Sequence, residues 1–259
     1  MTATPITRSR HSPIARFHWW RTVFWLIPAI TVYTVVLGTL SLASSLVDTR
    51  GYFAHRCARA WSWLILSTTG VRVHVRGLDR LEPGKTYVFV ANHQSLYDIP
   101  VVFASLPYQL RIIAKDSLGR FPFLGWHLRR SGHLLVNRKK PDPRGVFNWA
   151  NALTSKGLSL VVFPEGTRSE AGYIGAFKAG SLYPAVQAGL AIVPISVAGS
   201  RHVMKKGRLM TCPGEVELTV HDPIPTVAAA EPNIREVRAL ASRVKAIIAP
   251  LVEAEAARA

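Results

Sequence analysis

The stretch that decides the fold is Tyr87-Val88-Phe89-Val90-Ala91-Asn92-His93-Gln94-Ser95-Leu96-Tyr97-Asp98. Its apolar beginning, residues 87–90, is rich in strand formers and predicts a buried strand. Residues 99–103, which follow it, predict the start of a helix, because Pro100 is tolerated in a first helical turn. A strand that leads into a helix is the repeating unit of an α/β fold.

Two side chains in this stretch pair a base with a carboxylate. His93 and Asp98 are five residues apart, and on a continuous helix they would point about 140° away from each other. The backbone between them must therefore turn if the two groups are to meet. Such a pair can take a proton from a hydroxyl group. The alternative is that Asp98 caps the helix and His93 is a loop residue without chemistry.

A second motif, Phe163-Pro164-Glu165-Gly166-Thr167-Arg168, follows the apolar run at residues 158–162. Pro-Glu-Gly predicts a turn, in which Gly166 is free to take a positive φ. The turn would present Glu165, Thr167 and Arg168 at the carboxyl end of a strand, where open α/β sheets bind ligands. The planar guanidinium of Arg168 suits a phosphate. The alternative is an ordinary turn with a solvated arginine.

Further strands and helices alternate along the rest of the chain. Residues 71–76 alternate with period two, as expected of a strand with one buried face. Other candidate strands are residues 87–90, 110–114, 133–136, 158–163, 191–197 and 215–220, with helices expected at 99–105, 146–156 and 178–188. A final amphipathic helix follows Asn233, which forms a cap-like pair with Glu236. We therefore predict an α/β fold with a mostly parallel central sheet flanked by helices.

Composition favours an anionic partner. The 259 residues include 32 Lys and Arg against 15 Asp and Glu, a net charge of +17. Nucleic acid, anionic lipid and a phosphorylated substrate all fit this balance, but no RNA-recognition signature or basic zipper helix occurs, so nucleic acid is not expected. Cys57 and Cys212 are far apart and form no CxxC, so neither a metal site nor a disulfide framework is predicted.

The N-terminal segment suggests a membrane. Residues 22–47 carry no charge and are long enough to cross a bilayer as a helix. Trp19, Trp20 and Trp25 lie at its start, as interfacial aromatic residues do. The alternative is a buried helical hairpin in a soluble protein, since Pro28 and Gly38 interrupt the run.

Arginines both before and after this segment argue against a simple single crossing. A shorter apolar run follows at residues 61–66. We therefore expect an N-terminal apolar helical hairpin that enters one leaflet and returns, leaving the rest of the chain on the cytoplasmic face of the inner membrane. This divides the chain into membrane-associating helices at residues 1–70 and an α/β domain at residues 71–259.

Together, the motifs resemble those of the glycerolipid acyltransferases, and of the bacterial 1-acylglycerol-3-phosphate acyltransferases in particular. The resemblance rests on Asn92-His93 with Asp98 and on the motif at residues 163–168, and it covers about residues 71–220. Two further blocks, Gly132-His133-Leu134-Leu135-Val136-Asn137-Arg138 and Val193-Pro194-Ile195, occur in the order that the family shows. The family often has a bulky aromatic residue in place of Leu135 and an acidic one in place of Asn137, which affects the expected acceptor preference.

The resemblance implies an enzyme that transfers a fatty acyl group to the free sn-2 hydroxyl of lysophosphatidic acid, giving phosphatidic acid. His93 would be the general base, and Asp98 would hold its other ring nitrogen. The donor would be an acyl thioester of acyl carrier protein or coenzyme A, with no further cofactor. Because the chain has no G-x-S-x-G elbow, we expect direct transfer without a covalent acyl-enzyme.

The acceptor would be held by the second motif. Glu165 is expected to bond its glycerol, and Arg168 its phosphate, with help from Arg138. The Gly166 N–H is expected near the phosphate or a developing oxyanion, beside Thr167. Lys115 would add a positive charge, or else be a solvated surface lysine. The aromatic segment at residues 121–127 would line an acyl-chain groove or pack in the core.

Two other functions fit part of the sequence. The same chemistry could serve another lysophospholipid or a lyso-aminolipid as acceptor. A non-catalytic basic protein that binds membranes or nucleic acid would explain the charge but not the pair of motifs.

Overall fold

A seven-stranded sheet forms the centre of the computed structural model, which describes residues 13–137, 142–169, 173–229 and 231–257. The strands are β1 (Val71–Arg76), β2 (Val88–Ala91), β3 (Leu110–Lys115), β4 (Leu134–Val136), β5 (Ser159–Val162), β6 (Ile192–Ala198) and β7 (Gly214–Val220). Their order is β1-β7-β6-β2-β5-β3-β4, and every neighbouring pair is parallel except β6 with β7. The mostly parallel sheet that the sequence predicts is therefore confirmed.

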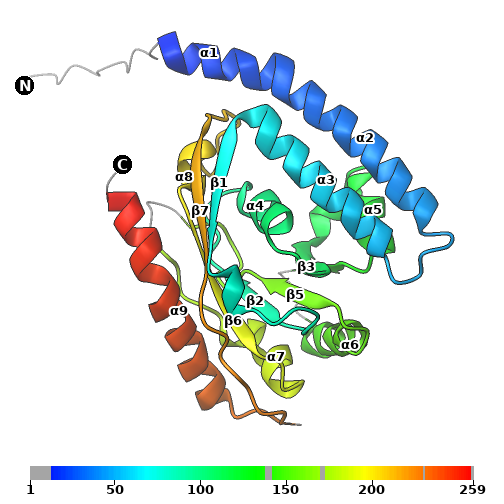
Figure 1. Cartoon of the computed structure of the whole chain (residues 1–259), viewed down its shortest axis with the longest axis vertical. Coiled ribbons are helices and arrows are strands. Elements are labelled where there is room, and N and C mark those ends of the chain that lie inside the picture. Colours follow the sequence, from blue (N-terminus) through cyan, green and yellow to red (C-terminus); the bar gives the residue numbers. More distant parts are fainter. Residues whose placement is uncertain (1–12, 138–141, 170–172, 230, 258–259) are drawn as a thin grey trace, which may run out of the picture.

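Helices cover both faces of the sheet (Figure 1). One face carries α3 (Tyr52–Thr69), α4 (Asp98–Ser105) and α5 (Leu124–Arg130). The other carries α6 (Pro143–Thr154), α7 (Tyr183–Gln187) and α9 (Ile234–Ala257), while α8 (Ser200–Val203) is a single turn after β6. The helix expected at residues 178–188 is shorter than predicted, because a 3₁₀ turn at Ala179–Ser181 precedes α7.

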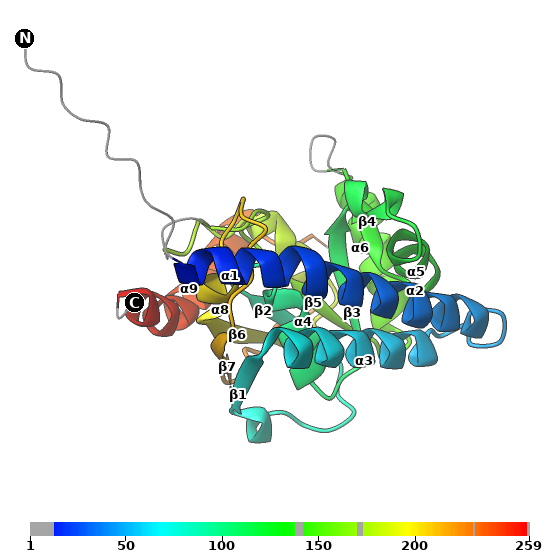
Figure 2. The ribbon, with the colours of Figure 1, turned by 90° about the horizontal axis from the view of Figure 1, so that it is seen from above.

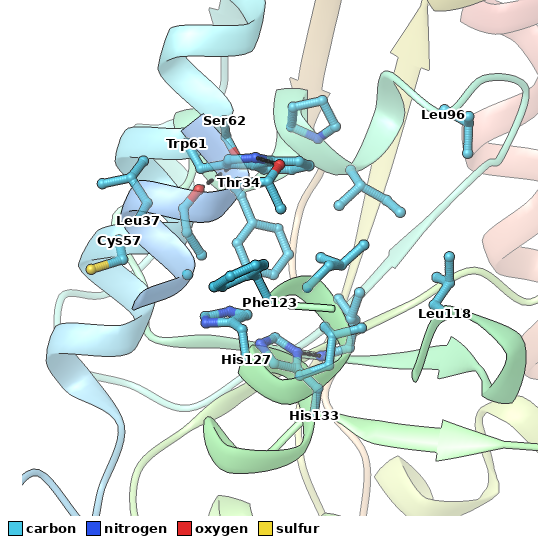
Figure 3. A pocket seen from close by; sticks show the side chains of 18 residues that line it. Thr34, Leu37, Cys57, Trp61, Ser62, Leu96, Leu118, Phe123, His127 and His133 are labelled. Atoms are coloured by element: carbon cyan, nitrogen blue, oxygen red, sulfur yellow. Dashed lines mark hydrogen bonds between the residues drawn. The ribbon is translucent and has the colours of Figure 1, made fainter. Parts of the chain in front are cut away.

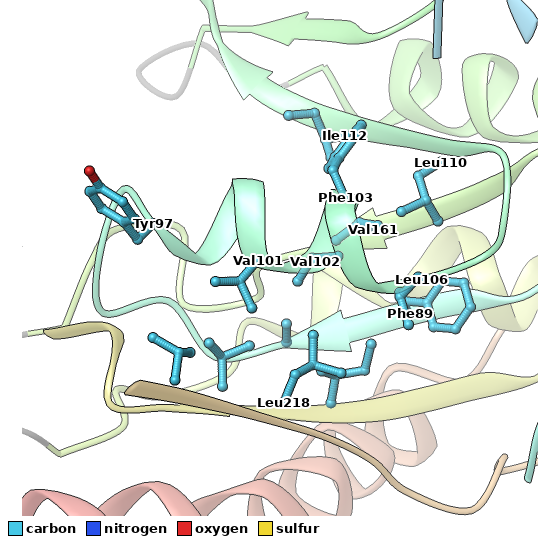
Figure 4. Packing of buried hydrophobic residues seen from close by; sticks show 14 of the residues in the cluster. Phe89, Tyr97, Val101, Val102, Phe103, Leu106, Leu110, Ile112, Val161 and Leu218 are labelled. Atoms are coloured by element: carbon cyan, nitrogen blue, oxygen red, sulfur yellow. The ribbon is translucent and has the colours of Figure 1, made fainter. Parts of the chain in front are cut away.

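Side chains alternate between the two faces of the sheet along each strand, which explains why helices pack on both faces. All four residues of β2 are buried. Phe89 packs with Val101 and Val102 of α4 in one core cluster (Figure 4), whereas Val88 and Val90 belong to the cluster on the α9 side. Successive side chains of a strand point to opposite faces, so a strand that is apolar throughout requires helices on both sides.

The first element of the described residues is one long apolar helix. α1 (Pro13–Arg21), a π-helical turn at Thr22–Leu26 and α2 (Ile27–Ser44) run on without a break, and Ile14–Ser44 is long and apolar enough to cross a membrane. Its 31 residues correspond to about 46 Å at 1.5 Å per residue, more than the hydrocarbon core of a bilayer. The helix lies across the outside of the domain (Figure 2), and large apolar side chains such as Trp20, Phe24 and Trp25 remain exposed.

The predicted N-terminal apolar hairpin is found only in part. α3 packs along α2, where Tyr33 Oη lies 2.9 Å from Thr68 Oγ1. However, α3 carries exposed Arg56 and packs one face on the domain through Ile65 and Leu66, which belong to the main core. α3 is therefore an amphipathic helix that covers the sheet. Within its short apolar run at residues 61–66, Ile65 and Leu66 face the core, whereas Trp63 is exposed.

Candidate active site

The site lies where β2 ends. Asn92, the first residue after β2, is fully buried, and its side-chain amide pairs with the backbone of Val197 in β6. The amide Nδ2 donates to the Val197 carbonyl and Oδ1 accepts from the Val197 N–H, both at 2.8 Å. The side chain thus continues the pairing of β2 with β6 by one more step and fixes the direction in which the chain leaves the sheet.

The structure brings His93 and Asp98 into contact. His93 Nδ1 lies 2.8 Å from Asp98 Oδ2, and the side chains are 12% and 0% exposed. The same oxygen accepts the backbone N–H groups of Gln94 and Ser95 at 2.7 and 2.8 Å, which closes the turn that the five-residue spacing requires. The carboxylate therefore organises the loop and orients the imidazole at the same time.

This contact defines the proton on the ring. A carboxylate can only accept, so Nδ1 carries the hydrogen and Nε2 is left as the proton acceptor of the neutral imidazole. The Phe163 ring packs against the imidazole, with ring centroids 4.5 Å apart. A histidine held in this tautomer can take a proton from a hydroxyl group placed at Nε2.

The second motif meets the first at the same edge of the sheet. β5 is the parallel neighbour of β2, so the loop at residues 163–169 lies beside the turn that holds His93. Glu165 is 7% exposed; its Oε1 accepts the His93 N–H at 2.7 Å and its Oε2 accepts the Gly175 N–H at 2.9 Å. Burial raises the pKa of Glu165, while these two N–H donors act in the opposite direction. The Ser169 N–H donates to the His93 carbonyl at 2.8 Å.

The other predicted binding residues have different surroundings. Gly166 has the positive φ of +71° that the turn predicts, and its N–H donates to the Phe163 carbonyl at 3.0 Å. The expected use of this N–H for a phosphate or oxyanion stays a prediction. Thr167 is exposed and Arg168 half-buried on the same loop. Lys115 is exposed at the carboxyl end of β3, with β5 between it and β2. Arg138 lies outside the described residues.

Sequence reasoning missed Lys178. Its N–H donates to the Pro164 carbonyl at 3.0 Å, and its ammonium group approaches the backbone of Gly166 so closely that a Cβ built there would lie 3.0 Å from Nζ. This places a second cation on the loop of Arg168. The only signal in the sequence is that Lys178 is the single charged residue between positions 171 and 188. The sequence pattern instead predicts that Lys178 is the first residue of a helix at residues 178–188.

An apolar cavity of about 280 Å³ begins beside the His93 turn. Leu96, from the turn, lies at one end, and Phe123, His127 and His133 line another part (Figure 3). Ile99, at the start of α4, also lines the cavity. The remaining walls come from α2, α3 and β3. Burial, with Arg111 nearby, lowers the pKa of His127 to about 4 and that of His133 well below its usual value, so both rings are neutral and the cavity carries no charge.

No three His, Cys, Asp or Glu side chains are grouped as metal ligands within the described part of the chain. The site contains His93 bonded to buried Asp98, a second buried carboxylate at Glu165, the loop of Arg168 with Lys178 against it, and an adjoining apolar cavity. These groups suit a group-transfer enzyme. The cations can bind the charged end of a substrate, and the apolar cavity can bind its apolar end.

Comparison with known proteins identifies the family. The family model called Acyltransferase matches residues 72–198, and the chain belongs to this family. It is 33% identical over 180 residues to the chloroplastic 1-acyl-sn-glycerol-3-phosphate acyltransferase LPAT1 of Arabidopsis thaliana, and 34% identical over 178 residues to the human 1-acyl-sn-glycerol-3-phosphate acyltransferase alpha. These matches cover 68% of this chain, but only 49% and 62% of the respective relatives, so the chain spans about half the length of the plant relative.

A solved structure has the same fold. The crystal structure of the 1-acyl-sn-glycerophosphate (LPA) acyltransferase PlsC from Thermotoga maritima aligns with a TM-score of 0.73 and 27% sequence identity. The alignment covers 90% of this chain and 97% of that one, so it includes helices as well as the sheet.

Proposed function

We propose that this protein transfers a fatty acyl group from an acyl thioester to the sn-2 hydroxyl of lysophosphatidic acid, giving phosphatidic acid. The observation that carries the proposal is the 2.8 Å contact between His93 Nδ1 and Asp98, made beside the loop of Arg168. Relatives named 1-acyl-sn-glycerol-3-phosphate acyltransferases support the choice of acceptor. Membership of the acyltransferase family favours an enzyme over a basic binding protein.

In the proposed reaction, Nε2 of His93 takes the proton of the acceptor hydroxyl while its oxygen attacks the thioester carbonyl. Asp98 stabilises the imidazolium that forms. When the carbon–sulfur bond breaks, the imidazolium returns the proton to the leaving thiolate, and the new ester remains on the acceptor. The transfer is direct, without an acyl-enzyme. The donor thioester belongs to acyl carrier protein or coenzyme A, and no other cofactor takes part.

Arg168 and Lys178 hold the phosphate of the acceptor in this proposal, because both lie on or against the loop next to His93. Arg138 and Lys115 are further cations for the same end of the substrate. The apolar cavity receives an acyl chain, since it begins at Leu96 beside the His93 turn and is lined almost entirely by apolar groups.

We also propose that the long N-terminal helix attaches the protein to the cytoplasmic face of the inner membrane, with residues 1–70 as the attaching part and residues 71–259 as the catalytic domain. Exposed Trp20 and Phe24 on a helix of bilayer length support this. Single cysteines placed at Arg16 and Lys205 should react with an impermeant reagent from the same side of the membrane. Reaction from opposite sides would contradict the proposed orientation.

The test of the activity is an acceptor panel with purified protein. Lysophosphatidic acid, another lysophospholipid and a lyso-aminolipid are each offered with acyl-coenzyme A or acyl carrier protein thioester. We expect the fastest turnover with lysophosphatidic acid, and we expect His93→Ala to lose most of this activity. Turnover of only another acceptor would support the alternative substrate. Salt-sensitive DNA binding without any turnover would support the non-catalytic alternative.

A further inference from the structure

Glu165 has an unusual pair of partners for a residue in a substrate loop. Its two carboxylate oxygens take backbone N–H groups from two separate segments: His93, which follows β2, and Gly175, in the segment that leads to Lys178. The side chain is buried, and a Cβ built on Gly175 would lie 3.1 Å from Oε2. Glu165 therefore bridges these two segments, and little of its side chain is accessible to solvent.

We propose that Glu165 is a positioning residue, which holds His93 by its main-chain N–H and places a second negative charge behind the imidazole, and that it does not bond the acceptor. The inference rests on the proposed function, because it assigns a part in the same reaction. It replaces the acceptor-binding part that the sequence predicts for Glu165.

The hydrogen bonds of His93 and Glu165 support the proposal that Glu165 holds His93 by its main-chain N–H. His93 is held at three points: its N–H by Glu165, its carbonyl by the Ser169 N–H, and its ring by Asp98. Each carboxylate oxygen of Glu165 faces an N–H donor, so both oxygens have to act as acceptors. This favours the ionised carboxylate. Hydrogen bonds to a charged acceptor are about twice as strong as neutral ones. Without Glu165, the buried N–H of His93 would lack this partner.

The charges around His93 support the proposal that Glu165 places a second negative charge behind the imidazole. Two carboxylates face His93, Asp98 from the first turn of α4 and Glu165 from the loop after β5. Each favours the imidazolium that forms when His93 takes the proton. Arg168 and Lys178, the cations on and against that loop, act in the opposite direction. Removal of the Glu165 charge should therefore make His93 a weaker base.

The experiment compares Glu165→Gln with the unaltered full-length protein in lysophosphatidic acid turnover. We expect kcat to fall about 10- to 100-fold, the range that loss of one charged hydrogen bond allows, with the acceptor KM changed less than about threefold. The acid limb of the kcat/KM profile should move to lower pH, because Glu165→Gln removes a negative charge that favours the imidazolium. The titration of the acceptor phosphate is common to both proteins and cancels in the comparison.

Glu253→Gln is the matched control. Glu253 lies on α9 and accepts the Ile174 N–H at 3.3 Å, so it holds the same segment as Glu165 but has no bond to His93. Its variant should keep both kcat and the acid limb. If the Glu165→Gln protein does not fold, Glu165→Asp replaces it; this keeps the charge, so we expect a lower kcat with an unmoved acid limb.

A raised acceptor KM with unchanged kcat and acid limb, in either Glu165 variant, would overturn the inference and return Glu165 to acceptor binding. This outcome leaves the proposed function intact. The proposed function itself fails in a different way, since then the unaltered protein does not turn over lysophosphatidic acid at all.

Discussion

His93 and Asp98 divide their tasks at the scale of single residues. The imidazole bears the proton transfer, while the carboxylate both orients it and closes the turn through Gln94 and Ser95. The two residues should therefore respond differently to substitution, although both belong to one contact.

His93→Ala should lower kcat by about 10²- to 10⁴-fold, the usual contribution of a general base, and should leave the unfolding midpoint almost unchanged. Asp98→Asn should also lower kcat, and in addition it should reduce the free energy of unfolding by about 1–3 kcal/mol, because the three N–H groups that converge on Oδ2 would lose their charged acceptor. Turnover and urea unfolding in the same detergent measure both effects. Exposed Asp79→Asn is the control, and an Asp98→Asn protein of unchanged stability would contradict the turn-closing part.

Arg168 and Lys178 should decide how the enzyme uses the acceptor's phosphate. Arg168→Ala, and to a smaller extent Lys178→Ala, should raise KM about 10-fold or more for lysophosphatidic acid, while an acceptor without a phosphomonoester should be affected little. Lys156→Ala is the control, since it removes a positive charge just before β5 begins, at the opposite edge of the sheet. An equal rise in KM for both acceptors would show that Arg168 and Lys178 do not bind the phosphate.

At the scale of elements, α2 lies so close to α5 that only a glycine fits between them. A Cβ built on Gly38 would be 2.9 Å from the Cβ of Phe123, a residue with an uncommon positive φ of 58°. Both residues line the cavity. The size of the cavity therefore depends on how closely the two helices approach.

Gly38→Leu should force α2 away from Phe123, because its Cβ alone would lie 2.9 Å from the Phe123 Cβ. It should thereby disturb the part of the cavity that these two residues line and move the donor preference towards shorter acyl chains. A series of acyl-coenzyme A donors of increasing length measures this, and we expect kcat/KM to fall most for the longest. Val36→Leu, on the exposed side of the same helix, should leave the preference unchanged. An unaltered chain-length profile in Gly38→Leu would mean that the acyl chain does not occupy this cavity.

Sequence patterns predicted the elements near the site better than those at the N-terminus. β2 and α4 were predicted because an apolar run and a proline-bearing first turn are local signals. The part of α3 in the main core was not, because Ile65 and Leu66 look alike whether they face lipid or a sheet. The antiparallel pairing of β6 with β7 was also hidden, since strand direction depends on connections that periodicity does not show.

The candidate site was also predicted only in part, because local sequence patterns do not show contacts between distant segments. The spacing of His93 and Asp98 required a turn, and a turn is present. The partners of Glu165 could not be foreseen, because the Gly175 N–H comes from a segment with no motif. Lys178 was hidden for the same reason. Contacts between loops that are distant in sequence depend on which strands are neighbours in the folded sheet, and a local sequence pattern does not show this.

At the scale of the whole molecule, a buried group of one arginine and three histidines lies between α3, β3 and α5. Arg111 is fully buried and donates to the carbonyls of Arg50 and Gly51. Burial, with the Arg111 charge, lowers the pKa of His55 to about 3 and of His127 to about 4, and lowers that of His133 as well. The folded protein thus keeps three histidines neutral that the unfolded chain would protonate below pH 6.5.

Stability should therefore be complete above pH 6.5 and fall as the pH decreases below it. In the unfolded chain these histidines gain protons near their ordinary pKa, whereas in the folded protein they do not until about pH 4 or below. Each histidine contributes a slope of about 1.4 kcal/mol per pH unit in this window. His55→Leu should reduce the slope by that amount in urea unfolding between pH 6.5 and 4.5, whereas exposed His74→Gln should not. An unchanged slope in His55→Leu would contradict this account.

The long N-terminal helix also supplies part of the cavity wall, through Thr34, Leu37 and Gly38. It is consequently not a detachable anchor. A shortened version prepared for easier purification would leave the cavity open to water along one side. Loss of activity in such a fragment would report the missing wall and not only the missing membrane, so the two effects have to be separated by point substitutions within the intact chain.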